Sequence, residues 1–368
     1  MSFFQNHSNW PLVPLKDIAT LKRGYDLPVK SRAEGDVPIY AANGQNGTHN
    51  VAKIKAPGVV TGRSGTIGKV HYTERDYWPL NTALYVTDFH GNEPKWVFYM
   101  LQAFKLERFV EGAGVPTLNR NLVHDELIPL PPLKEQKRIA AILDKADAIC
   151  RKRKYSIDLA EQFLRSVFLD MFGDPVTNPK GWKVQPVGKV VDCIVPGRDK
   201  PKSFTGDIPW ITTNDLFHLG TTFSSKSGMG LSVSEINEVR AKVIPKDSVL
   251  MTCVGDLGLV SISGCDFVMN QQLHAFLPNE QVNKYFLMYA LSFQKGHMKR
   301  VASSTTVPYM NKTICNNVPL ITPMLKEQSR FGLIYEATME AIVKSNDSLS
   351  ELNALFNSLR QRAFKGKL

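Results

Sequence analysis

Leu133-Lys134-Glu135-Gln136 organises the whole sequence, because it returns 192 residues later as Leu325-Lys326-Glu327-Gln328. At the same spacing, Val115-Pro116-Thr117-Leu118-Asn119-Arg120 returns as Val307-Pro308-Tyr309-Met310-Asn311-Lys312. Self-similarity at a fixed spacing is the sequence signature of a repeat architecture. The chain is therefore expected to contain two copies of one structural unit.

The repeat extends back to the start of each copy, at spacings that grow from 171 to 190 residues and so indicate insertions in the second copy. The matched segments are Trp10-Pro11-Leu12 with Trp182-Lys183-Val184, Gly35–Ile39 with Gly206–Trp210, Val60–Gly68 with Leu250–Gly258, and Asn81 with Asn270.

A long amphipathic helix is predicted after each motif, because apolar residues recur there at the three- and four-residue spacing of one helix face. Pro131-Pro132 and Pro323 mark the two starts, and Gly173 marks the end of the first helix. From Leu133 to Met171 such a helix would be about 58 Å long at about 1.5 Å per residue. The predicted seam residues are Ile139, Leu143, Ile157, Leu164, Val167, Phe331, Ile342, Leu349, Leu352, Phe356 and Leu359.

Neither helix can bury its stripe alone. A head-to-tail duplication closes into a pseudo-two-fold object when the two helices pack antiparallel against each other, so we expect a coiled-coil-like pair. The alternative is that each helix packs only on its own globule. The residues before each helix predict a mixed α/β globule, with strands near 58–61, 83–86 and 248–251 and short helices near 96–109 and 284–299.

Between the predicted strands lie loops rich in Asn, Gln, Thr and Arg, the side chains that hydrogen-bond to base edges. Such residues also serve solubility in any loop, and that reading stays open. The candidate DNA-binding residues are Asn43, Gln45, Asn46, His49, Arg63, Asn119, Arg120, Thr213, Asn214, Gln271, Gln272, Asn311 and Lys312. Further basic residues could contact phosphates, namely Lys22, Arg23, Arg32, Arg198, Lys200, Lys202, Lys299 and Arg300. Arg151-Lys152-Arg153-Lys154 is either a solvated helix face or a contact to DNA.

Composition agrees with a soluble DNA-binding protein of two domains. The 368 residues include 45 Lys and Arg against 34 Asp and Glu, a net charge of +11 that favours a polyanionic partner. No apolar run is long enough for a bilayer, the first residues do not resemble a secretory signal, and the five cysteines form no Cys-x-x-Cys pair. We expect a cytoplasmic protein without membrane association.

Motifs for catalysis are not recognised. The adjacent prolines of Leu130-Pro131-Pro132-Leu133 cannot serve as the Asn-Pro-Pro-aromatic segment of an adenine methyltransferase. The Gly62–Gly68 segment has the wrong spacing for a phosphate-binding loop and predicts a strand turn. Neither the histidines nor the cysteines show zinc-ligand spacing. We expect no catalytic residues, no metal and no cofactor in this chain.

Taken together, the two Leu-Lys-Glu-Gln motifs with their proline-rich entries, the Gly65/Gly68 and Gly255/Gly258 turns, and Asn81 and Asn270 resemble the specificity subunits of type I restriction-modification systems across nearly the full chain. The resemblance implies an α+β fold with target recognition domains at 1–130 and 174–322 and spacer helices at 131–173 and 323–368. Each domain would read one half of a bipartite double-stranded DNA site.

The resemblance also implies partners. Two methyltransferase (modification) subunits would bring S-adenosylmethionine and methylate adenine, and restriction/translocase subunits would use ATP and Mg to cleave DNA. This chain would direct both activities and perform neither. Two alternatives stay open, a stand-alone architectural or regulatory DNA-binding protein and an enzyme with an unfamiliar active site.

Overall fold

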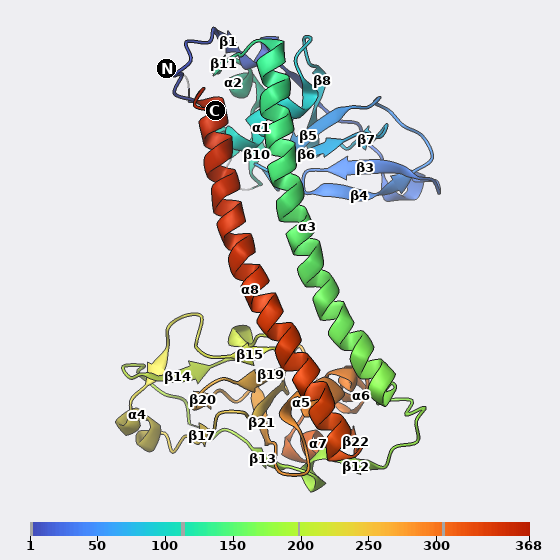
Figure 1. Ribbon diagram of the computed structural model, residues 1–368, viewed down its shortest axis with the longest axis vertical. Helices are drawn as coiled ribbons and strands as arrows, with labels where there is room; N and C mark the ends of the chain where they lie inside the picture. Colours follow the sequence, from blue (N-terminus) through green and yellow to red (C-terminus); the bar gives the residue numbers. More distant parts are fainter. Residues whose placement is uncertain (1–2, 112–114, 198, 304–305) are drawn as a thin grey trace. The chain divides into compact units, whose positions relative to one another are not determined.

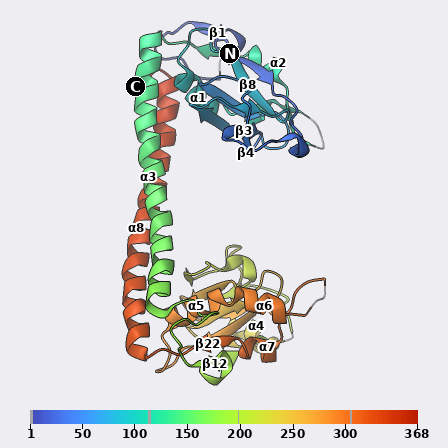
Figure 2. The same ribbon diagram turned by 90° about the vertical axis from the view of Figure 1, so that its right-hand side faces the viewer.

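The computed structural model describes residues 3–111, 115–197, 199–303 and 306–368. The chain divides into two compact units (Figures 1 and 2). The first unit comprises Met1–Lys154 with Asp347–Leu368, and the second comprises Tyr155–Asn346. Both units mix strands and helices, which agrees with the predicted α+β class. The four segments predicted from the sequence, two recognition domains and two spacer helices, are divisions along the chain and not these two spatial units, so that division stays a prediction.

The first unit contains a four-stranded sheet, a three-stranded sheet and two strand pairs. The four-stranded sheet has the order β2 (Thr20–Arg23), β8 (Ala83–Asp88), β5 (Gly58–Gly62), β6 (Val70–Thr73), and the three-stranded sheet has the order β4 (Gly44–His49), β3 (Val37–Ala41), β7 (Trp78–Pro79). The pairs are β1 (Leu12–Pro14) with β11 (Leu127–Pro129) and β9 (Val110–Glu111) with β10 (Thr117–Leu118). The helices before the long one are α1 (Pro94–Ala103) and α2 (Arg120–His124), and 3-10 turns lie at Leu15–Asp17, Val29–Ser31 and Leu106–Phe109.

The second unit repeats this plan with additions. Its larger sheet has the order β13 (Asp192–Ile194), β21 (Leu273–Leu277), β18 (Val249–Thr252), β19 (Val260–Ser263), β15 (Thr221–Thr222), and its smaller sheet has β16 (Gly230–Leu231), β14 (Ile208–Ile211), β20 (Phe267–Met269), β17 (Val243–Ile244). β12 (Val184–Pro186) pairs with β22 (Pro319–Ile321). The helices are α4 (Val233–Glu238), α5 (Lys284–Phe293), α6 (Lys295–Val301) and α7 (Lys312–Asn316), with 3-10 turns at Val187–Lys189 and Thr213–Asp215.

Matching backbone hydrogen bonds confirm that the two units are copies of one plan. The amide of Gly65 donates to the carbonyl of Pro116 at 3.0 Å, and the amide of Gly255 donates to that of Pro308 at the same distance. The strand turn predicted at Gly62–Gly68 is confirmed as the connection of the β5–β6 hairpin.

One equivalence drawn from the sequence is wrong. The amide of Arg63 donates to the carbonyl of Thr82, and the amide of Cys253 donates to that of Gln272, so the structural counterpart of Asn81 is Gln271 and not Asn270. Aligning the two asparagines because they are identical shifts the alignment by one residue. The backbone hydrogen-bond register, and not the identity of the side chains, determines which residues are equivalent.

Both long helices are present, α3 at Leu133–Phe172 and α8 at Leu325–Phe364. Gly173 follows α3 with φ 73°, the left-handed conformation that commonly ends a helix. The shorter helix predicted near 96–109 ends at Ala103 and continues as a separate 3-10 turn.

Within each unit the start of one long helix packs beside the end of the other, and the directions are opposite. In the first unit Ile139 and Leu143 share an apolar core with Phe364. In the second unit the Phe168 and Phe331 rings meet edge to face at 5.2 Å. Both cores also include residues of the globule, such as Trp96 in the first unit. The two packing alternatives weighed from the sequence therefore occur together.

The predicted seam residues are all withdrawn from solvent to some degree. Ile139, Leu143, Ile157, Leu164, Phe331 and Ile342 are buried, and Val167, Leu349, Leu352, Phe356 and Leu359 are half-buried.

The glutamine of each Leu-Lys-Glu-Gln motif fastens its helix to its globule. Gln136 Oε1 accepts a hydrogen bond from the amide of Glu93, which caps α1, at 2.9 Å. Gln328 Oε1 accepts one from the amide of Asn283, which caps α5, at 3.0 Å. Each Nε2 also donates to the carbonyl of the proline five residues earlier, at 3.0 and 2.8 Å. The motif therefore orients the long helix on the globule.

The residues near the two ends of the chain meet in the first unit. The amide of His7 donates to the carbonyl of Lys365 at 3.0 Å. Asn6 closes a turn by accepting from the amide of Trp10 at 3.1 Å, and Asn178 closes the same turn with Trp182 at 2.9 Å in the segment that follows α3. Among the described residues, no helix is both long enough and apolar enough to span a membrane.

Candidate nucleic-acid interface

In the first unit, backbone hydrogen bonds tie two segments that carry candidate residues to each other and to the segment of Asn81 and Thr82. The loop that begins at Arg63 is bonded to the Thr82 carbonyl before β8, and Leu118 donates to the Arg63 carbonyl at 2.8 Å. Arg63 Nε donates to the carbonyl of Asn81 at 2.8 Å, which fixes the course of its side chain. Arg63, Asn119 and Arg120 therefore lie on connected segments.

The Asn119 side chain has a structural task. Its oxygen caps α2 by accepting from the amide of Asn121, and its Nδ2 donates to Glu111 Oε2 at 3.1 Å. Arg120 is exposed at the first position of α2. Of these two neighbours, Arg120 is the one free to reach outward.

A second group of candidates lies on the smaller sheet. Asn43, Gln45 and Asn46 are exposed in the β3–β4 turn and on β4. Arg32 Nη1 donates to Asn46 Oδ1 at 3.1 Å. His49 does not belong to the exposed group, because it is only 8% exposed, its Nδ1 accepts from an amide, and its ring packs on Trp78. We correct its assignment from DNA contact to packing.

The second unit brings its candidates together in the same way. The Cys253 amide donates to the Gln272 carbonyl, and the Met310 amide donates to the Cys253 carbonyl, both at 2.9 Å. Asn311 and Lys312 follow directly, with Asn311 capping α7 and Lys312 exposed. The amide-bearing loop and the start of α7 are therefore adjacent.

Beside that loop lies a cavity of about 400 Å³, lined by Lys200, Pro201, Phe204, Trp210, Asn270, Gln271 and Gln272. Gln271 Nε2 donates to the carbonyl of Gly197 at 3.1 Å, and Asn270 Nδ2 donates to Gln272 Oε1 at 3.0 Å. Aromatic walls beside amides and a lysine suit a nucleic acid base. The sequence reasoning missed Phe204 and Trp210, whose signal is their place beside a basic loop.

Thr213 and Asn214 lie in a 3-10 turn at the end of β14 that Asp215 closes, since Asp215 accepts from the Thr212 amide at 2.7 Å. The Lys226 ammonium donates to the Asn214 carbonyl. Arg198, one of the basic residues proposed for phosphate contact, lies outside the described residues.

Sequence reasoning also missed a cluster of thiols inside the second unit. Cys193 and Cys253 interact with His274, which is 5% exposed, and Cys253 also interacts with Cys315. The partner thiol of Cys315 and the nearby imidazole hold the pKa of Cys253 below its ordinary value. Burial acts against the charged form of His274, but the hydrogen bonds with Cys193 and Cys253 prevail and raise its pKa to about 9.

The cluster replaces aliphatic core. The first unit has Leu21, Leu84 and Val123, all buried, at the positions of Cys193, His274 and Cys315. No group of three or more His, Cys, Asp or Glu within the described residues is placed to hold a metal ion.

The fold and its loops define a class of protein, a duplicated two-domain α+β chain whose copies each present polar side chains on connected loops. A family model described as type I restriction modification DNA specificity domain matches residues 7–158 and 179–350. The chain belongs to this family.

Known relatives carry the same description. The chain is 23% identical to the MjaIX type I specificity subunit of Methanocaldococcus jannaschii over 47% of this chain and 42% of that one. It is 27% identical to the HindI specificity subunit of Haemophilus influenzae over 48% of this chain and 40% of that one. The match therefore spans less than half the length of these two relatives.

Solved structures show the same fold. The S subunit of a type I restriction-modification system from M. genitalium matches with a TM-score of 0.63 at 15% identity, over 98% of this chain and 97% of that one. A chain from a study of complex assembly in a type I system matches with a TM-score of 0.57 at 17% identity, over 99% and 100%.

Proposed function

We propose that the chain reads double-stranded DNA as the specificity subunit of a type I restriction-modification complex, with each unit reading one half of a bipartite site. The supporting observation is that the two units share one scaffold and differ in the side chains it presents. Arg63 stands where the second unit has the buried Cys253, and Asn81 stands where it has Gln271, so the first unit presents an arginine where the second presents none. A common scaffold with different readers is what two different half-sites require.

The recognition chemistry is direct readout supported by phosphate contacts. Amides such as Gln271 and Gln272 bind adenine through two hydrogen bonds, and an exposed arginine such as Arg120 binds guanine likewise. Lys200 and Lys312 contribute the charge that positions the duplex without reading sequence. Asn43 and Gln45 supply a further exposed polar surface on the first unit.

The long helices would act as an antiparallel, pseudo-two-fold spacer that sets the distance between the half-sites and docks two modification subunits. The chain itself would be non-catalytic and bind no cofactor, and would work in the cytoplasm. Its partners would use S-adenosylmethionine for adenine methylation, and restriction/translocase subunits would use ATP and Mg.

The test is methylation mapping in a host that expresses the chain with the modification subunit. The expected motif has two short specific halves around a fixed gap of arbitrary bases. A single continuous motif would contradict the proposal. DNA binding without methylation or co-purification of a methyltransferase would favour the stand-alone DNA-binding protein, and turnover by the isolated chain would favour an enzyme.

A further inference from the structure

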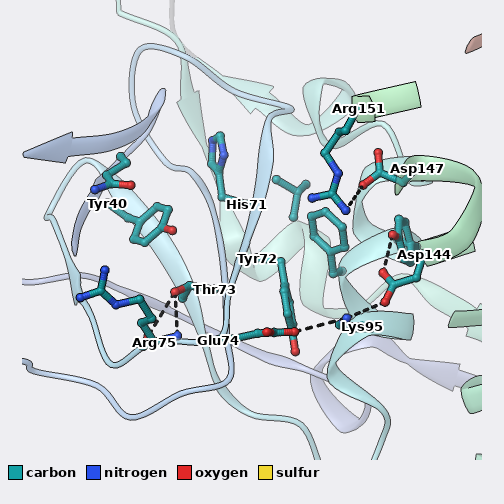
Figure 3. A pocket seen from close by; sticks show the side chains of 14 residues that line it. Tyr40, His71, Tyr72, Thr73, Glu74, Arg75, Lys95, Asp144, Asp147 and Arg151 are labelled. Atoms are coloured by element: carbon teal, nitrogen blue, oxygen red, sulfur yellow. Dashed lines mark hydrogen bonds and ion pairs between the residues drawn. The ribbon is translucent and has the colours of Figure 1, made fainter. Parts of the chain in front are cut away.

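A cavity of about 750 Å³ lies in the first unit (Figure 3), and only one of the candidate DNA-binding residues, Gln45, is among its lining residues. One wall is β6 and the turn after it, including Tyr72 and Glu74, and other walls come from α1 and α3. Lys95 on α1 binds Glu74 at 3.3 Å and Asp144 on α3 at 2.5 Å. Tyr40 on β3 and Gln45 on β4 complete the lining, so side chains of five elements build the cavity.

The second unit shows how the equivalent strand edge is covered. β19 corresponds to β6, because Val249 faces Ile262 in one unit as Val59 faces Tyr72 in the other. On the outer side of β19 the chain adds the parallel strand β15. The amide of Ile262 donates to the Gly220 carbonyl at 2.9 Å, and that of Gly264 donates to the Thr222 carbonyl at 2.8 Å.

Among its described residues, the first unit has no counterpart of this added strand. A turn at residues 42–43 joins β3 to β4, whereas residues 212–229 join β14 to β16 and include β15. Within the described part of the chain, β6 pairs with β5 alone. The equivalents of the bonded amides, those of Tyr72 and Glu74, therefore face the open edge.

The lining favours polypeptide over nucleic acid. Three carboxylates, Glu74, Asp144 and Asp147, balance three basic side chains, so the cavity offers phosphate no net attraction. All three basic groups are already bound, Lys95 to Asp144, Arg151 to Asp147 at 3.1 Å and Arg75 to Asp36 at 2.8 Å. An open edge instead supplies unpaired N–H and C=O groups, which an extended peptide can satisfy.

Side-chain groups in the cavity could complete such a contact. The Nε2 of His71 is buried and, among the described residues, has no hydrogen-bond partner. Tyr72, Phe98 and Tyr99 add aromatic surface. In the second unit the corresponding segment places Leu219 against the apolar core, and its carbonyl accepts from Tyr335 at 2.9 Å.

We propose that the β6 edge and its cavity dock an extended segment of a partner protein, which pairs parallel to β6 as β15 pairs with β19. The inference rests on the proposed function for the identity of the partner, the modification subunit. It deepens that function by assigning a protein contact to the β6 edge of the recognition globule, next to the candidate DNA-binding residue Gln45.

Amide hydrogen exchange on the full chain tests the pairing, with the modification subunit, a duplex of the mapped motif, or both. We expect the amides of Tyr72 and Glu74 to exchange about tenfold more slowly or better with the subunit, the effect of one added hydrogen bond. The amides of Ile262 and Gly264 are the internal control and should not change.

Two results would overturn the docking proposal and leave the proposed function intact. One is a complex that assembles and methylates while the amides of Tyr72 and Glu74 exchange unchanged. The other is protection of these amides by the duplex alone. Failure of the chain to bind any modification subunit would overturn both proposals.

Two substitutions separate the edge amide from the side chain. Tyr72→Pro removes the ring and the outward N–H at an edge position where proline is tolerated, and Tyr72→Ala removes the ring but keeps the N–H. We expect Tyr72→Pro to bind the subunit about tenfold more weakly than Tyr72→Ala. Equal binding by both variants, each folded by circular dichroism, would contradict the pairing.

Discussion

Replacing Gln136 by methionine should loosen α3 from the first globule. The side chain is 2% exposed and makes three hydrogen bonds, with the Glu93 amide at 2.9 Å, the Pro131 carbonyl at 3.0 Å and Asn92 Oδ1 at 2.8 Å. Methionine keeps the length and volume of the side chain but none of these bonds. The substitution therefore measures the polar anchor with little change in packing.

The expected cost follows from the bonds removed. Each net hydrogen bond contributes about 1 kcal/mol, and buried groups left unpaired add to the loss, so the free energy of unfolding of the first unit should fall by about 3–5 kcal/mol. Gln328→Met should do the same in the second unit, where Gln328 is 1% exposed and binds the Asn283 amide and the Pro323 carbonyl.

Native-state hydrogen exchange resolves the two units in one experiment. Gln136→Met should raise exchange in α1 and leave α5 unchanged, and Gln328→Met should give the reverse. Lys137→Met, at an exposed position next to the anchor, is the matched control and should change neither. A loss below about 1 kcal/mol for Gln136→Met, or equal losses in α1 and α5, would refute the anchoring role.

Three further predictions test other parts of the molecule. Gln272→Leu should reduce base discrimination in one half-site by about 1–3 kcal/mol, whereas Lys312→Gln should weaken binding to all DNA sequences alike and lower the salt dependence of binding by about 0.9 in slope. Fluorescence anisotropy on matched and mismatched duplexes distinguishes the two effects. A sequence-dependent effect of Lys312→Gln would count against its phosphate role. The Phe168 ring is 0% exposed and stacks on Phe293 at 5.3 Å between ring centroids. Phe168→Ala should lower the free energy of unfolding of the second unit by about 3–5 kcal/mol, measured by denaturant unfolding. A loss near zero would contradict its core position. Glu235 accepts hydrogen bonds, of which the one from Ser203 has the largest effect, and they lower its pKa to about 2. The charged carboxylate therefore stabilises the fold fully above pH 4.5, its ordinary pKa, and this stabilisation is lost as the pH falls toward 2. The difference in melting temperature between wild type and Glu235→Gln should shrink over that range, and a constant difference would refute this role of Glu235.

The repeat and the two long helices were predictable because short stretches of sequence specify both. Identical motifs 192 residues apart revealed the duplication, and prolines before Leu133 with Gly173 behind marked α3 within one residue of its observed end at Phe172. The apolar stripe predicted which helix face is covered. It did not predict that the same residues pack on both the other helix and the globule, because periodicity identifies a face and not what lies against it.

The missed features depend on register and on contacts distant in sequence. The correspondence of Asn81 with Gln271 is determined by backbone hydrogen bonds, and these cannot be read from the identity of the side chains. Cys193 on β13 meets His274 on β21, and Cys315 on α7 meets Cys253, only because elements far apart in the sequence pack together. His49 has the composition of a base reader, and its burial against Trp78 comes from sheet packing.

The turn that Asn6 and Trp10 form beside Lys365 is the same turn that Asn178 and Trp182 form after α3. In the second unit it lies on a continuous chain, and in the first it meets the end of α8 through a contact between segments far apart in sequence. One kind of junction, from the end of a long helix to the turn before a globule's first strand, is therefore made twice, once by peptide bonds and once by a noncovalent contact.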